Sequence, residues 1–412
     1  MRINKLTLSN GLRLVHHLDT STQMVALNIV YDVGARDEHP QHTGFAHLFE
    51  HLMFGGSAHI PDYDTPLQQA GGENNAWTNN DITNYYLTVP RANVETAFWL
   101  ESDRMLELAF SEQSLEVQRG VVMEEFKQRC LNQPYGDVGH LLRPLAYKVH
   151  PYQWPTIGKE LSHIADATLD EVRRFFFRFY APNNAVLAVT GNISWDDTVR
   201  LTEKWFAPIP RRDVPVRNLP QEPEQMAERR LTVERNVPVD ALFMAWHMCA
   251  RGEPDYYAFD ILSDILSNGR SSRLNRRLVQ EQKLFSSIDA YISGSRDAGL
   301  LQLSGKPAAG VSLQQVEDAV WRELDELCRV PIGEAELEKV KNKFESTQIF
   351  GNINYLNVAT NLAWYELTGK AEDIDLEVGN YRAVTHEQLQ AVATDAFRRE
   401  NTSVLYYKRK DQ

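Results

Sequence analysis

The chain of 412 residues is poor in cysteine and has no long hydrophobic run. Its three cysteines, Cys130, Cys249 and Cys328, are far apart and form no C-x-x-C pair, which argues against a disulfide framework and a zinc ribbon. No stretch of 18 apolar residues occurs, so we expect no membrane partner. The opening MRINKLTLSNGLRLV lacks the apolar core of a signal peptide. We therefore expect a cytoplasmic protein, or a periplasmic one if the sequence has been trimmed.

Positive charge is also in short supply. Lysine and arginine number 43 against 56 acidic residues, which gives a formal net charge of −13 at pH 7. Proteins that bind the phosphate backbone are normally basic, so we expect no nucleic-acid partner. The hydrophobic fraction of 43% is that of an ordinary globular protein, and the length predicts two domains, each with its own core.

A proline-rich segment divides the chain. Residues 207–230 carry five prolines and many charges without helical or alternating periodicity, which is typical of a linker. We therefore expect a first domain at 1–207, a linker at 208–230 and a second domain at 231–412.

The two halves end in the same pattern. A helix-like segment at 168–180 precedes the apolar run 185–189, and 217 residues later a segment at 385–397 precedes the run 403–407. The repeat predicts two duplicated α+β domains of mixed sheet and helices. The alternative is that any helix followed by a strand produces this pattern.

Local patterns predict the elements that carry the chemistry. Asn-Gly turns favour hairpins, β-branched runs favour strands, and proline is common in the first turn of a helix. On these grounds we expect a hairpin around Asn10-Gly11, strands at 24–33 and 84–89, and helices at 44–54, from Pro90 to Leu108, at 111–128 and after a capping box at Thr168.

The sequence His47-Leu-Phe-Glu50-His51 lies on the helix predicted at 44–54. Histidines four residues apart share one face of a helix, one turn apart, which is the spacing that two imidazoles need to bind one Zn²⁺. Glu50 lies beside them and can act as a general base toward a water activated by the metal. The alternative is a chance match on a solvated helix.

A catalytic zinc site needs a third protein ligand. The helix predicted at 111–128 offers the consecutive residues Glu124 and Glu125. Helical periodicity does not choose between them, and both could simply be solvated.

These residues resemble the inverzincins, the family of the pitrilysin and insulysin peptidases and of mitochondrial processing peptidase. Further blocks match the family in the same order along the chain. They are VGARDE (33–38), GFAHLFEHLMFGGS (44–57), NNAWTNNDITNYY (74–86), RGVVMEE (119–125), HPYQWPTIG (150–158), YAPN (180–183) and SSRL (271–274). The chain length resembles the short branch, whose peptidases combine two chains of this size.

The resemblance implies a metallopeptidase with a fold like that of LuxS and mitochondrial processing peptidase, forming half of a clamshell. His47, His51 and Glu125 are implied as ligands of one Zn²⁺, with Glu50 as the general base. Several relatives carry a second acidic residue seven positions before the ligand glutamate. Here that position is Gln118, which departs from the pattern.

A segment near 74–78 resembles the strand that binds substrate in this family. Gly71-Gly72 and the polar run 79–81 frame a short edge strand, and an edge strand can pair with an extended peptide. The alternative is an edge without a ligand. The resemblance implies Asn75, Ala76 and Trp77 as the residues that bind the substrate backbone.

One departure bears on the partner. Family members that are competent alone carry an arginine and a tyrosine seven residues apart after the SRL block, where they stabilise the oxyanion and hold the peptide. Here Val279 and Ser286 occupy these positions, although Arg276, Arg277 and Tyr291 lie nearby. We therefore expect a heterodimer with a homologous subunit that lacks the zinc motif and supplies the pair. A homodimer with another oxyanion stabiliser is the competing interpretation.

The sequence thus predicts a zinc metalloendopeptidase subunit that hydrolyses short or unfolded peptides. Two alternatives stay open at this point. One is a non-catalytic structural subunit of a larger complex, against which the intact motif argues. The other is a peptidase dedicated to maturing one precursor peptide.

Overall fold

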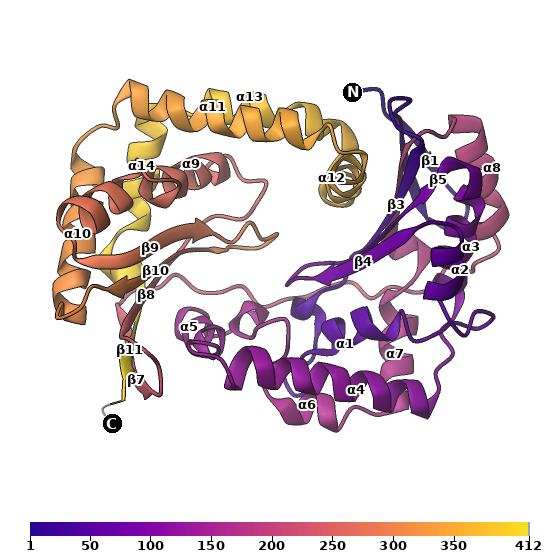
Figure 1. The fold of residues 1–412 in the computed structure, drawn as a ribbon, viewed down its shortest axis with the longest axis horizontal. Helices are drawn as coiled ribbons and strands as arrows, with labels where there is room; N and C mark the ends of the chain where they lie inside the picture. Colours follow the sequence, from indigo (N-terminus) through magenta and orange to yellow (C-terminus); the bar gives the residue numbers. More distant parts are fainter. Residues whose placement is uncertain (411–412) are drawn as a thin grey trace. The chain divides into compact units, whose positions relative to one another are not determined.

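The computed structural model describes residues 1–410, which form two compact units, each built from segments of both halves of the chain. Unit 1 contains Met1–Lys127, Trp154–Asn218 and Gln348–Glu377, and unit 2 contains Gln128–Gln153, Leu219–Thr347 and the chain from Val378 onward. Each unit has one mixed sheet with helices on it (Figure 1), which confirms the α+β prediction.

The sheet of unit 1 has six strands in the order β1-β2-β6-β3-β5-β4, of which β2 and β6 are parallel neighbours. Along β3, Leu27 and Ile29 enter the core on one face, and Ala26 and Val30 enter the core on the other. Because both faces are buried, β3 is apolar almost throughout. The strands are β1 (Asn4–Thr7), β2 (Arg13–Leu18), β3 (Met24–Tyr31), β4 (Glu73–Thr78), β5 (Thr83–Pro90) and β6 (Ala185–Gly191).

Helices cover both faces of this sheet. The first face packs against helices from the N-terminal half, and its core includes Leu48, Phe98 and Phe176. The second face packs against α12 (Tyr355–Thr368), through Val358 and Leu362 among others. The remaining helices of unit 1 are α1 (Phe45–Leu52), α2 (Asp64–Gln69), α3 (Val94–Leu106), α4 (Glu112–Phe126), α6 (Leu161–Ala165), α7 (Leu169–Phe179) and α8 (Trp195–Phe206).

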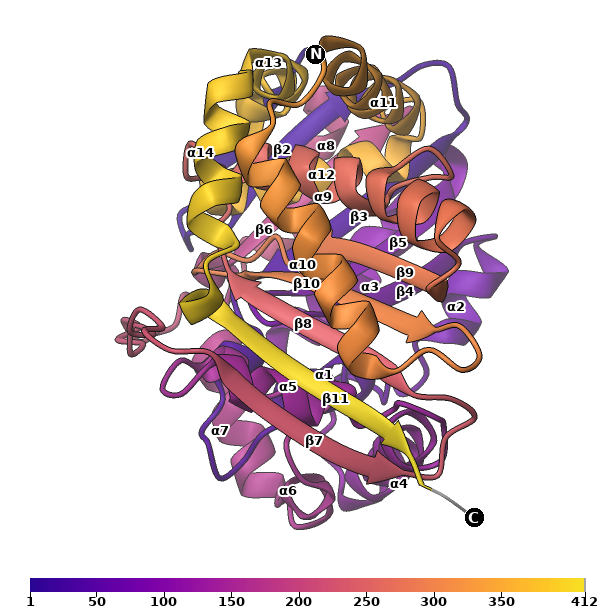
Figure 2. The same cartoon turned by 90° about the vertical axis from the view of Figure 1, so that its left-hand side faces the viewer.

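The sheet of unit 2 has five strands in the order β7-β11-β8-β10-β9. Figure 2 shows α9, α10 and α14 in front of this sheet, and α5 covers its other face, where Leu142 and Ala146 pack against β8 and β11. The elements are α5 (Val138–Ala146), β7 (Arg229–Arg235), β8 (Ala241–His247), α9 (Tyr256–Ser267), β9 (Phe285–Ile292), β10 (Leu300–Pro307), α10 (Leu313–Arg329), α14 (His386–Ala396) and β11 (Thr402–Arg409), together with most of α11 (Glu334–Gly351) and α13 (Glu377–Ala383), which cross the boundary between the units.

The two sheets have the same strand order, apart from the additional edge strand β1 in unit 1. In both, a parallel pair (β2 with β6, β7 with β11) is followed by three antiparallel neighbours. Helices α5 and α12 begin 217 residues apart, at Val138 and Tyr355, and each packs on the sheet built from the other half of the chain. The predicted division at 1–207, 208–230 and 231–412 cuts the chain into consecutive segments. The compact units are not consecutive, because α5 from the first segment belongs to unit 2 and α12 from the last segment belongs to unit 1.

Most of the predicted elements are present. The hairpin β1–β2, the strand β3, the helices α1 and α4, and the capping box at Thr168 all occur. The helix predicted to start at Pro90 is wrong at its start, because Pro90 is the last residue of β5, opposite Met24. A short 3₁₀ turn, Arg91–Asn93, follows, and α3 begins at Val94. A proline fits the end of a strand as well as the start of a helix, because its φ suits both.

No helix within residues 1–410 is both long and apolar enough to cross a membrane.

Candidate metal centre

Helix α1 begins after Gly44, a position where no residue with a side chain fits. Gly44 has a φ of +87°, a left-handed conformation, and a Cβ there would lie 2.6 Å from the Ile164 side chain and 2.8 Å from the Ile157 carbonyl oxygen. Glycine alone fits both the backbone and the space. The block that contains Ile157 and the block that contains Gly44 therefore meet at the start of α1.

His47 and His51 project from successive turns of α1 toward one point. Their ring centroids are 4.9 Å apart with an interplanar angle of 87°, so the two imidazoles approach edge to face. The side chain of His47 is 9% exposed and that of His51 is 24% exposed. The predicted one-turn spacing therefore places both rings on the same face of the helix.

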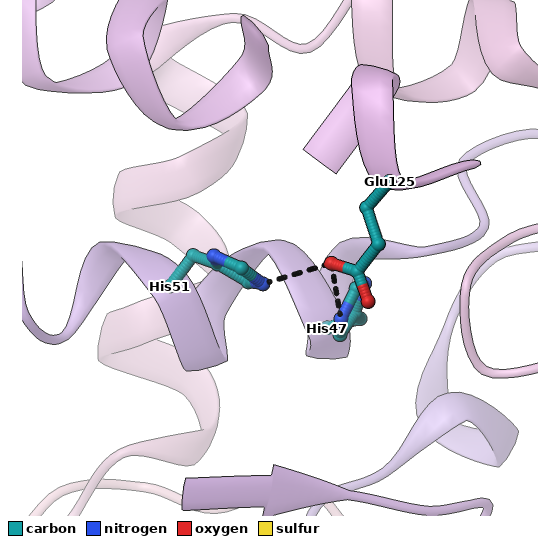
Figure 3. Close-up of side chains that lie close together, drawn as sticks. All are labelled: His47, His51 and Glu125. Atoms are coloured by element: carbon teal, nitrogen blue, oxygen red, sulfur yellow. Dashed lines mark ion pairs between the residues drawn. The ribbon is translucent and has the colours of Figure 1, made fainter. Parts of the chain in front are cut away.

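Glu125 reaches this point from α4, which packs against α1. Its Oε2 lies 3.5 Å from His47 Nε2 and 3.4 Å from His51 Nε2 (Figure 3). The neighbouring Glu124 pairs instead with Lys127 Nζ at 2.5 Å. Helical periodicity could not distinguish Glu124 from Glu125, and in the structure Glu125 is the one that faces the two histidines.

The three side chains fit the coordination of a zinc ion. Two ligands at the usual zinc distances in a tetrahedral site are about 3.3 Å apart, close to the separations between Glu125 and each imidazole. All three ligand atoms lie within 4.8 Å of one another. Two imidazoles and one carboxylate are also the donor set of many catalytic zinc sites, which leave one position for water or substrate.

Glu50 lies on α1 between the two histidines and is partly buried. Two buried phenol groups, those of Tyr85 and Tyr180, interact electrostatically with its carboxylate. Burial raises the pKa of both tyrosines, and the negative charge of Glu50 adds to this rise. The Tyr85 hydroxyl donates to the Phe49 carbonyl oxygen, and its oxygen lies 3.3 Å from that of Tyr180. Neutral phenols therefore support the helix that carries Glu50.

The predicted substrate strand is an edge strand, since β4 pairs with β5 alone within the described residues. It also contacts α1, so the structure brings it beside the metal centre. Ala76 packs toward the core on the α1 side of the sheet, and Trp77 packs toward the core on the α12 side. Asn75 is exposed, and its side-chain oxygen accepts a hydrogen bond from the Ala76 amide at 2.8 Å.

The residues weighed as an Arg/Tyr pair all lie in unit 2. Val279 packs against the core of that unit, and the Ser286 hydroxyl donates to the Lys306 carbonyl oxygen. Arg277 forms ion pairs with Glu323 and Glu326.

The remaining residues of this kind are Arg276, 3.7 Å from Glu281, and Tyr291, which is 50% exposed on β9. Gln118, at the position where relatives carry an acid, is partly buried on α4.

Reasoning from the sequence missed Glu38. Its carboxyl group is buried and accepts hydrogen bonds from the Gly44 and Ala46 amides at the start of α1. No motif spacing indicates this, because Glu38 lies in a loop. The available signal was that the residue before the helix is a glycine, which cannot cap it.

Two family models match the chain. Residues 13–158 match the model described as Insulinase (Peptidase family M16), and residues 166–344 match the Peptidase M16 inactive domain. The chain is 29% identical over 342 residues to "Zinc protease PqqE" of Helicobacter pylori, across 82% of this chain and 77% of that protein.

Solved structures share the fold. A protease from Helicobacter pylori superposes with a TM-score of 0.94 at 26% identity and covers 99% of each chain. The periplasmic protease PqqL from Escherichia coli superposes with a TM-score of 0.80 at 18% identity, over 98% of this chain and 47% of that chain.

Proposed function

Because the chain belongs to peptidase family M16, we propose that it is the zinc-bearing subunit of an endopeptidase that hydrolyses short or unfolded peptides. The observation that carries this proposal is the convergence of His47, His51 and Glu125, with Glu50 on the same helix as the histidines. One Zn²⁺ per chain suits this donor set.

The residues divide the chemistry among them. A zinc ion bound by His47, His51 and Glu125 would make a water more acidic and polarise the peptide carbonyl. Glu50 takes up a proton from the attacking water and delivers it to the leaving amine, as a general base and then a general acid. The phenol groups of Tyr85 and Tyr180 stay protonated, because burial raises their pKa, and support the helix of Glu50.

The substrate would bind as an added strand on β4, at Asn75, Ala76 and Trp77. The Ala76 amide donates to the side chain of its neighbour Asn75. A substrate carbonyl could take the place of the Asn75 oxygen without leaving an amide unsatisfied. Recognition of this kind reads the peptide backbone, so we expect broad sequence preference.

The active unit would be a heterodimer with a homologous chain that lacks the zinc motif. Val279 and Ser286 cannot donate as an arginine and a tyrosine would, and Arg277 is held by two glutamates. The chain also spans about half the length of the E. coli protease whose fold it shares. We propose that a partner subunit supplies the missing Arg/Tyr pair and that the two chains close like a clamshell around the peptide. A cytoplasmic location stays a prediction.

Hydrolysis of a quenched fluorescent peptide library tests this function. The zinc-loaded chain is assayed alone and mixed with the candidate partner subunit, with Glu50→Gln as the control. Activity that requires the mixture and is lost in Glu50→Gln supports the split active site. Full activity of the chain alone would contradict the need for a partner, and absence of activity in every mixture would contradict the peptidase proposal.

A further inference from the structure

The first turn of α1 has no cap of its own. The amides at the start of a helix lack partners within it and are usually capped by the side chain of the residue just before the helix. Here that residue is Gly44, and the left-handed backbone and the crowding by Ile157 and Ile164 exclude any residue with a capping side chain. A cap for α1 must therefore come from elsewhere in the chain.

Glu38 provides this cap. Its Oε2 accepts from the Gly44 amide at 2.9 Å, and its Oε1 accepts from the Ala46 amide at 2.8 Å. The residue is 6% exposed.

The cap acts one residue away from a metal ligand. Ala46 directly precedes His47, and α1 is only eight residues long, so a displacement of its first turn displaces the His47 imidazole. Glu125 lies on a different helix, α4, so a shift within the first turn of α1 changes its distance from His47. Metal ligands must be held within a fraction of an ångström, so this separation is sensitive to the cap.

We propose that Glu38 is a positioning residue of the metal centre, which sets the distance between His47 Nε2 and the Glu125 carboxylate by holding the first turn of α1. This inference rests on the proposed zinc-dependent function. Glu38 does not touch the metal or the substrate, so its effect reaches the site through the backbone of α1.

The test measures the zinc dissociation constant of the purified full chain by competition with a chromophoric chelator. Wild type is compared with Glu38→Gln, Glu38→Ala and the control Asp103→Asn. Asp103 is also buried in unit 1, and it accepts hydrogen bonds from the His59 amide at 3.0 Å and the Ser57 hydroxyl at 2.5 Å, two residues that follow the end of α1. The visible absorption spectrum of the Co²⁺-substituted protein reports the ligand geometry independently of activity.

Loss of the cap is expected to weaken zinc binding about 10-fold or more in Glu38→Ala and to alter the Co²⁺ spectrum. Glu38→Gln keeps the shape and one acceptor oxygen, so it should weaken binding less, and it serves alone if Glu38→Ala does not fold. Asp103→Asn should match wild type. Unchanged zinc affinity and Co²⁺ spectra in the Glu38 variants, or equal weakening in Asp103→Asn, would overturn the inference. Failure of wild type to bind zinc would instead overturn the proposed function.

Discussion

Glu124 and Glu125 are consecutive on α4, yet their carboxylates serve different partners. Glu125 lies 3.4 Å from His51 Nε2, whereas Glu124 lies 2.5 Å from Lys127 Nζ on the surface. Successive residues of a helix point about 100° apart, so only one of the two can face α1. This difference makes the pair a matched test of the metal centre.

Glu125→Gln should abolish tight zinc binding, because a neutral amide oxygen is a much poorer ligand than a carboxylate. Glu124→Gln removes the same charge one residue away and should leave zinc binding unchanged. Metal content after dialysis, measured by atomic emission, distinguishes the two. Equal zinc content in both variants would show that Glu125 is not a ligand.

A buried ion pair lies in the core of unit 1. Arg104 and Glu101 are each 1% exposed, with Nε 3.0 Å from Oε2, and the Tyr63 hydroxyl donates to the same carboxylate at 2.6 Å. Glu101→Gln should lower the free energy of unfolding by about 3–5 kcal/mol, because the guanidinium stays buried without its counter-charge. Urea unfolding measures this cost.

The double variant Glu101→Gln with Arg104→Met is the control for this pair. It removes both charges and should recover part of the lost stability. A cost below about 1 kcal/mol for Glu101→Gln alone would contradict the account of a tightly coupled buried pair.

The stability of the protein should depend on the protonation of Glu38. Burial raises the pKa of Glu38 from 4.5 to about 8, the charge of Asp37 adds to the rise, and the hydrogen bonds from the Ala46 and Gly44 amides oppose it. Between these two pKa values, the folded protein keeps a proton on Glu38 that the unfolded chain releases. The resulting stabilisation is full below pH 4.5 and is lost as the pH rises through 8.

Glu38→Gln cannot titrate and should lack this dependence. Between about pH 5 and pH 9, the free energy of unfolding of wild type should fall by more than about 1 kcal/mol relative to the variant. Urea unfolding of zinc-free protein at several pH values checks this and avoids the proton linkage of metal binding. Parallel pH profiles for the two proteins would contradict the raised pKa.

Local sequence was informative wherever one element carried its own signal. The spacing of His47 and His51, the capping box at Thr168 and the Asn-Gly hairpin depend on neighbours within a few residues, and all three occur in the structure. The strand order repeated in both units also agrees with the duplication expected from the 217-residue offset.

Long-range relationships were not accessible in the same way. The exchange of α5 and α12 between the two sheets depends on packing between segments far apart in the sequence, which no local pattern indicates. The choice of Glu125 over Glu124 depends on how α4 is rotated against α1, which the resemblance supplied and periodicity did not. Glu38 entered only as the last residue of the block VGARDE and received no role, because its partners are backbone amides, which leave no trace in the sequence.

The most direct test of the central claim is the rate at which Glu50→Gln, mixed with the partner subunit, hydrolyses a quenched fluorescent peptide. The account predicts that this variant keeps one zinc ion per chain and the wild-type fold, while its rate falls by about 10²–10⁴-fold, the usual contribution of a general base. A zinc-loaded Glu50→Gln variant that cleaves the peptide at the wild-type rate would show that the centre formed by His47, His51 and Glu125 does not work through Glu50.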